Sequence, residues 1–107
     1  MSSKQAMGPI RAIGGTRGSN GYQQITDLSS ATSLTVPTTN PASFYAVIQC
    51  EGTALNYVRW RDDGTAPTSS VGMQLFCGSE LNYHGPLDAI QFINGTGSNK
   101  INVTYYV

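Results

Sequence analysis

Apolar residues in this chain recur at every second position in short runs, most clearly from Leu34 onward. The clearest runs are 34–36, 44–50 and 101–107, where apolar side chains alternate with Ser, Thr, Gln, Asn or Tyr. Successive side chains of a β-strand point to opposite faces, so this period predicts strands with one face against a core. No segment sustains a period of 3.6 residues, and residues 23–32 could form one helical turn at most.

Further strands are predicted at 55–61, 71–76, 81–83 and 87–93, separated by segments rich in Gly, Pro, Asn and Asp. We expect 44–61 to form one hairpin, and residues 94–99 to turn the chain in a second hairpin that ends in 101–107. About seven or eight short strands with frequent turn signals predict an all-β fold. The predicted architecture is a small antiparallel β-sandwich or barrel.

The chain has 107 residues, which predicts a single domain. Residues 1–21 are broken by glycines and are predicted to form an extended amino-terminal arm, and residues 22–107 the β-sandwich domain. The arm carries Lys4, Arg11 and Arg17 and no acidic residue, while the whole chain has no net charge. Ile10 and Ile13 are possible anchor points. The arm could dock on the mildly acidic body of a neighbouring subunit, or it could be a solvated flexible tail.

The strand at 57–61 is the best candidate for a contact surface within the domain. Val58 and Trp60 fall on one face and are expected in the core, whereas Tyr57, Arg59 and Arg61 fall on the other. Arginine and tyrosine are enriched at protein interfaces. We expect one arginine to pair within the domain with Asp62, Asp63 or Glu80 and the other to contact a partner.

No motif in the sequence points to catalysis or to a cofactor. Asp62 and Asp63 are adjacent, so their side chains point apart, and an aspartate beside Gly64 is typical of a turn. His84 is the single histidine and suits a turn. Cys50 and Cys77 lack metal-ligand spacing, so buried free thiols are expected, with a disulfide possible only if their strands are adjacent. No metal or cofactor is expected.

The composition limits the kinds of partner that the chain is expected to bind. Charged residues make up 11% of the chain, against about 25% in typical soluble domains. Such a surface is easier to desolvate against a protein, and three positive charges in the arm are too few to indicate nucleic-acid binding. No apolar run reaches the roughly 20 residues that span a bilayer. Without an apolar signal segment, the chain is expected to be made in the cytoplasm.

The segment 57–68, the triplet Val71-Gly72-Met73 and the ending 102–106 resemble small virion proteins of tailed bacteriophages. The resemblance covers roughly residues 44–107 and leaves out the arm. It implies a structural role without chemistry and a place in the virion, with the major capsid protein or other virion proteins as partners. Capsid decoration proteins, head–tail joining proteins and tail or collar proteins all have this size.

The leading hypothesis is a homo-oligomeric capsid decoration (cement) protein that clamps adjacent capsomers. Its expected contacts come from the arm and from the face of the central strand; they are Lys4, Ile10, Arg11, Ile13, Arg17, Tyr57, Arg59 and Arg61. One alternative is a ring protein of the neck or tail. Another is a carbohydrate-binding module of a receptor-binding apparatus, although a mid-strand Trp60 counts against it. An enzyme is the last of the alternatives.

Overall fold

The structure is a computed structural model that describes residues 19–38, 43 and 45–107. Eight strands and no helix occur in these residues, which confirms the all-β prediction. The strands are β1 (Ser19–Ile25), β2 (Thr32–Ser33), β3 (Tyr45–Glu51), β4 (Tyr57–Arg61), β5 (Met73–Phe76), β6 (Glu80–Tyr83), β7 (Gln91–Thr96) and β8 (Lys100–Tyr106).

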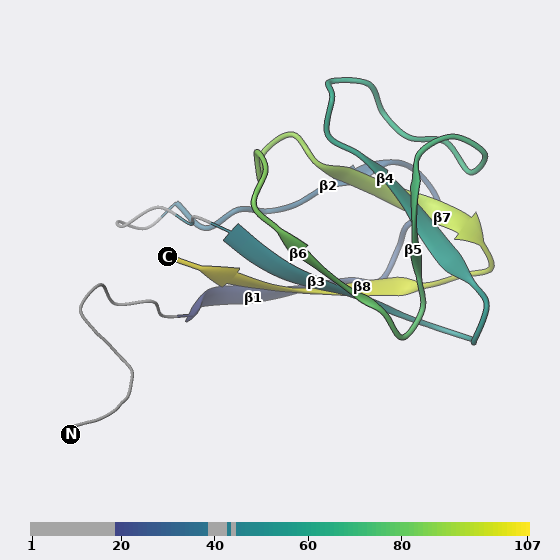
Figure 1. Cartoon of the computed structure of the whole chain (residues 1–107), viewed down its shortest axis with the longest axis horizontal. Coiled ribbons are helices and arrows are strands. Elements are labelled where there is room, and N and C mark those ends of the chain that lie inside the picture. The colour runs from purple at the N-terminus through teal and green to yellow at the C-terminus, as the bar shows by residue number, and fades with distance from the viewer. Residues whose placement is uncertain (1–18, 39–42, 44) are drawn as a thin grey trace.

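The strands form two four-stranded sheets. Figure 1 shows how the labelled strands are arranged in space. Sheet A has the order β1-β8-β3-β6 and sheet B the order β2-β7-β4-β5. Every pair within the two sheets is antiparallel. The architecture is therefore a β-sandwich, one of the two forms predicted from the turn spacing.

The core lies between the sheets and follows the predicted alternation. The fully buried residues of sheet A include Ala46 and Ile48 in β3 and Ile101 and Val103 in β8. Sheet B contributes three buried strand residues, and the connecting loops close the ends of the core. The remaining buried apolar residues are Ile25, Leu28, Leu34, Cys50, Val58, Leu75, Tyr83, Leu87, Ile90, Phe92 and Tyr105.

Both predicted hairpins are wrong. β3 lies in sheet A and β4 in sheet B, and β7 and β8 are divided between the sheets in the same way. Among the described strands, only β4 and β5 are both consecutive and paired. An apolar face can pack on the core from either sheet, so alternation does not show to which sheet a strand belongs. At both predicted hairpins the chain crosses from one sheet to the other instead of reversing within one sheet.

Two of the predicted strand ranges change the most. The strand expected at 34–36 is absent, and β2 ends at Ser33. The Thr35 N–H donates to the Gln23 side chain (3.0 Å) instead of to the backbone of a neighbouring strand. The strand expected at 87–93 begins only at Gln91, because Pro86 to Ala89 form a turn closed by a 3.0 Å backbone bond.

The amino-terminal strand β1 pairs with β8, so the sheet starts at Ser19, three residues before the expected start of the domain. The expected contacts in the arm lie outside the described residues, as does residue 44. These contacts, which stay predictions, are Lys4, Ile10, Arg11, Ile13 and Arg17.

A buried polar group holds the crossing from β7 to β8. Asn99 is 3% exposed. Its amide nitrogen lies 2.9 Å from the Thr96 carbonyl oxygen, 3.2 Å from that of Tyr57 and 3.2 Å from Asn94 Oδ1. Its own oxygen accepts a bond from the Cys77 thiol (3.3 Å). One side chain therefore connects three segments of chain at this end of the sandwich.

Candidate interaction surface

The outer side of β4 and β5 carries the predicted contact residues. Val58 is fully buried and Trp60 packs against the core, which confirms that Tyr57, Arg59 and Arg61 occupy the opposite side. The Tyr57 ring lies 5.2 Å from the ring of Phe76 on β5, and the Arg59 guanidinium lies 5.3 Å from the Tyr57 ring centroid. We call Tyr57, Arg59 and Phe76 the Tyr57 face.

The side chains of this face are held in place by the backbone beneath them. A Cβ atom at Gly95 on the neighbouring β7 would lie 2.2 Å from the Tyr57 ring, so the ring rests directly on that glycine. Arg59 donates to the carbonyls of Ser69 (3.1 Å) and Gly72 (2.8 Å). The Tyr57 face is therefore ordered before any partner arrives, which reduces the entropy lost on binding.

The two arginines differ in their partners. Arg61 donates two bonds to Asp63, with the Nε to Oδ1 distance at 3.0 Å. This hydrogen-bonded partner lowers the pKa of Asp63 and raises the pKa of Arg61. Arg59 has no carboxylate partner among the described residues. The pairing that the sequence left open is thus made by Arg61, and Arg59 is the arginine that can still bind a partner's carboxylate.

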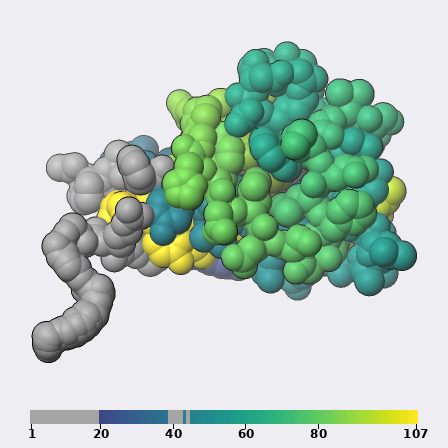
Figure 2. Space-filling view, in the orientation of Figure 1, coloured from purple at the N-terminus to yellow at the C-terminus, as the bar shows by residue number. Residues whose placement is uncertain are grey.

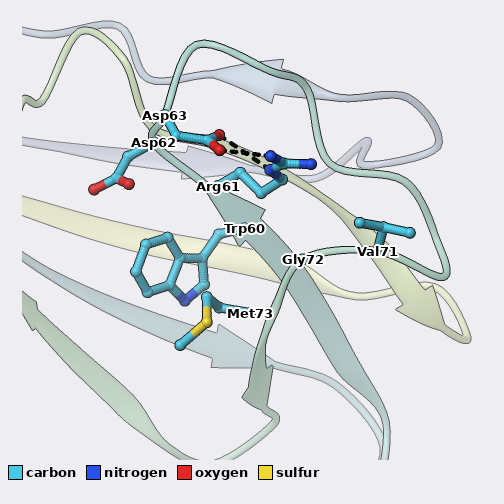
Figure 3. A pocket seen from close by; sticks show the side chains of 7 residues that line it. All are labelled: Trp60, Arg61, Asp62, Asp63, Val71, Gly72 and Met73. Atoms are coloured by element: carbon cyan, nitrogen blue, oxygen red, sulfur yellow. Dashed lines mark hydrogen bonds and ion pairs between the residues drawn. The ribbon is translucent and has the colours of Figure 1, made fainter.

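A shallow groove of about 510 Å³ opens beside this face. Figure 3 shows Trp60 beside Met73 on one side of β4 and the Arg61–Asp63 pair on the other side. Met73 is 60% exposed and Val71 52% exposed, so the groove offers apolar surface next to charged groups. We call it the Trp60 groove; its lining residues are Trp60, Arg61, Asp62, Asp63, Val71, Gly72 and Met73.

The turn before β4 carries a residue that the sequence did not single out. Leu55 is 84% exposed and has a φ of 73°, the only positive φ at a non-glycine position among the described residues. This left-handed conformation costs a leucine roughly 1–2 kcal/mol. An exposed apolar side chain in a strained turn has no role in the core of the isolated domain.

The outer side of sheet A is a polar surface of a different kind. Asn102 on β8 accepts bonds from the Tyr22 hydroxyl (2.7 Å) and the Gln24 amide (2.8 Å), and donates to Glu51 (3.0 Å) and, at 3.4 Å, to Gln49. Tyr22 is 64% exposed although its hydroxyl is held. We call these residues the Tyr22 face; they border a depression of about 390 Å³.

The other residues considered for chemistry have structural contacts. Asp62 accepts a bond from the Tyr83 hydroxyl (2.8 Å), and Asp63 accepts one from the Thr65 N–H (3.4 Å), as expected of a turn. The pKa of Tyr83 is raised, first by burial and then by the bond to Asp62. His84 stacks on the ring of Tyr45 at 4.8 Å.

In residues 19–38, 43 and 45–107, no group of three or more histidine, cysteine, aspartate or glutamate residues could hold a metal ion. No helix in that part of the chain is long and apolar enough to cross a membrane.

Comparison with known proteins gave no match: no protein-family model, curated protein or solved structure matches this chain.

Proposed function

We propose that this chain is a structural protein of a virion that decorates the capsid and acts by contact rather than by catalysis. The resemblance of residues 57–68 to small phage virion proteins suggests the class. The observation that carries the proposal is the exposure of large apolar side chains on β5 and in the loops that precede β4 and β5. Met73 and Phe76 lie on β5, and Leu55 and Val71 lie in the loops. Met73 pairs with Trp60 and Phe76 with Tyr57, so apolar side chains are exposed on both sides of this edge of sheet B. Exposed apolar surface is a common feature of protein interaction sites.

Leu55 is the most exposed of these apolar side chains, at 84%. Since a glycine or an asparagine would adopt its φ of 73° with less strain, the leucine is unfavourable for the isolated domain. Burial against a partner would stabilise an exposed leucine side chain by about 1.5–3 kcal/mol, enough to offset that strain. The turn is therefore better suited to a subunit in an assembly than to a free monomer.

The Tyr57 face supplies the directional part of the contact. Arg59 is fixed by two backbone carbonyls, and its guanidinium is within reach of a partner's carboxylate. A capsid surface repeats the same site many times, so each contact can be weak while attachment of an oligomer is strong. We propose the major capsid protein, or another virion protein, as the partner and a closed homo-oligomer as the binding unit.

The decisive variant is Leu55→Asn. Asparagine tolerates the left-handed conformation, so this variant should unfold at a temperature equal to or above that of the wild type. Its affinity for particles should nevertheless fall, by about 30-fold if Leu55 is a central contact. The measurement is co-sedimentation of the purified chain with virions stripped of it, beside a thermal melt. Unchanged affinity in a folded variant would remove Leu55 from the proposal.

Copy number separates decoration from the alternative place in a neck or tail ring. Quantitative mass spectrometry of purified virions should find on the order of a hundred or more copies per particle for a decoration protein. A count of about a dozen or fewer would favour a ring. Absence of the chain from purified particles would contradict both.

The Tyr22 face favours a second candidate function, binding of a neutral oligosaccharide by a receptor-binding apparatus. Exposed tyrosine rings can pack on sugars, and the amides and carboxylates beside Tyr22 can bond hydroxyl groups. The Trp60 side chain does not contribute, because it lies on the other sheet.

A glycan array separates the two functions through reciprocal variants. If the second function is correct, the wild-type chain binds a glycan, Tyr22→Ala abolishes that binding, and Leu55→Asn leaves it intact. Absence of binding to all glycans would contradict the second function and would leave the proposal of virion assembly to be tested by co-sedimentation and copy number.

A further inference from the structure

The two cysteines of the chain meet across the sandwich. Cys50 lies near the end of β3 in sheet A, and Cys77 directly follows β5 in sheet B. They are 27 positions apart in sequence, yet their sulfur atoms are 3.0 Å apart. The structure holds them as free thiols.

Backbone hydrogen bonds fix this approach independently of the side chains. The Gly78 N–H donates to the Cys50 carbonyl (2.9 Å), and the Cys50 N–H donates to the Ser79 carbonyl (3.3 Å). The Cys77 N–H donates to the Asn56 carbonyl (2.9 Å). Each cysteine is thus tied through its own backbone, so the two thiols can join without a rearrangement of the sheets.

The packing and burial around the two sulfur atoms also favour a bond between them. A Cβ atom at Gly52 would lie 2.9 Å from the Cys77 sulfur, so a glycine is needed there for the chain to pass. Cys50 is 1% exposed, whereas Cys77 is only partly buried. Burial raises the pKa of Cys50 from its ordinary value of 9.0 to about 12. Cys77 is therefore the thiol that an external oxidant reaches first.

We propose that Cys50 and Cys77 form a site of reversible disulfide formation that cross-links the two sheets. The oxidant is a small-molecule disulfide such as oxidised glutathione. The Cys77 thiolate attacks it, forms a mixed disulfide and releases one glutathione thiol. Cys50 then loses its proton and attacks the Cys77 sulfur, which forms the protein disulfide and releases the second glutathione thiol. Two protein thiols are oxidised, and one glutathione disulfide is reduced to two thiols.

The cross-link has a clear structural consequence. It closes a loop that contains β4 and β5, the strands that carry the Tyr57 face. It also adds a covalent bond between β3 and the end of β5, at a point where backbone hydrogen bonds already connect β3 to residues 78 and 79. The reducing cytosol would keep the site as two thiols, and an oxidising medium outside the cell would close it. This inference does not rest on the proposed function, since it concerns the sandwich alone.

The test is oxidation of the full reduced chain with oxidised glutathione, followed by intact mass and thermal melting. The wild type should lose about 2 Da, and a digest should contain a peptide pair linked through Cys50 and Cys77. Its melting temperature should rise by about 10 °C or more on oxidation and return after reduction. A wild type that retains both thiols, keeps glutathione attached, or melts at the same temperature in both states would overturn the proposal.

Single-cysteine variants test the order of attack. Cys50→Ser should accumulate a mixed disulfide at Cys77, with a mass gain of about 305 Da. Cys77→Ser should react far more slowly, because its remaining thiol is buried. Equal reaction rates would contradict the assigned roles, while the linked peptide of the wild type reports on the bond itself even if a variant fails to fold.

Discussion

Phe92→Ala is expected to remove most of the stability of the domain. Phe92 is fully buried at the centre of sheet B, where it lies opposite Trp60 on β4 and Thr32 on β2. Truncation of a buried phenylalanine leaves a cavity and costs about 3–5 kcal/mol. Domains of this size have a free energy of unfolding on the order of 5–10 kcal/mol. Urea unfolding followed by tryptophan fluorescence measures the loss, because Trp60 is the only tryptophan.

The matched control is Phe76→Ala, which removes the same atoms from the outer side of the same sheet. Phe76 is 41% exposed and packs against the Tyr57 ring. Its truncation should cost about 1 kcal/mol or less. If both variants lost the same stability, the assignment of Phe92 to the core and Phe76 to the surface would be wrong.

The second large effect is expected from Asn99→Asp, a substitution that preserves shape and introduces a charge. Asn99 directs its amide nitrogen at the carbonyl oxygens of Tyr57 and Thr96. A carboxylate would place negative charge against those oxygens in a buried site and lose the donors that satisfy them. We expect a cost of at least about 3 kcal/mol at pH 7. Asn82→Asp on the exposed side of β6 is the control and should change stability by about 0.5 kcal/mol or less.

The loss of stability in Asn99→Asp should grow as the pH rises. Burial raises the pKa of the introduced carboxyl above its unfolded value of about 3.9, so the folded variant retains a proton that the unfolded chain releases. The variant is therefore least disadvantaged below about pH 4 and loses stability as the pH rises from there toward the folded pKa. Urea unfolding from pH 4 to pH 7 should show the difference from wild type widening. A constant difference would mean that the carboxyl reaches solvent.

The alternation of apolar residues was a good guide to faces and a poor guide to neighbours. It assigned Ile48, Val58 and Val103 to the core, because burial of alternate residues is a local property of each strand. It could not tell which strand lies beside which, since a buried face fits equally in either sheet. The turn residues after β3 and β7 then suggested hairpins where the chain changes sheets.

For the candidate surface, too, the sequence predicted some residues and the structure was needed for others. Tyr57 and Arg59 were found because their strand alternates clearly, and the open choice between the two arginines needed the position of Asp63 to resolve it. Leu55 was missed because no sequence pattern reports a positive φ at a non-glycine residue. Tyr22 was missed because its strand, β1, has few apolar residues and shows no clear alternation. Backbone pairing to β8 holds this strand in sheet A.

The pairing of the first described strand with the last has a consequence for folding kinetics. β1 joins sheet A only through β8, so this sheet cannot be completed until β8 has been synthesised. Long-range pairings of this kind give a high contact order, and domains built from them fold in milliseconds to seconds rather than microseconds. During synthesis, a nascent chain that lacks β8 would leave one edge of β3 unpaired. Productive folding of sheet A therefore waits until β8 has left the ribosome.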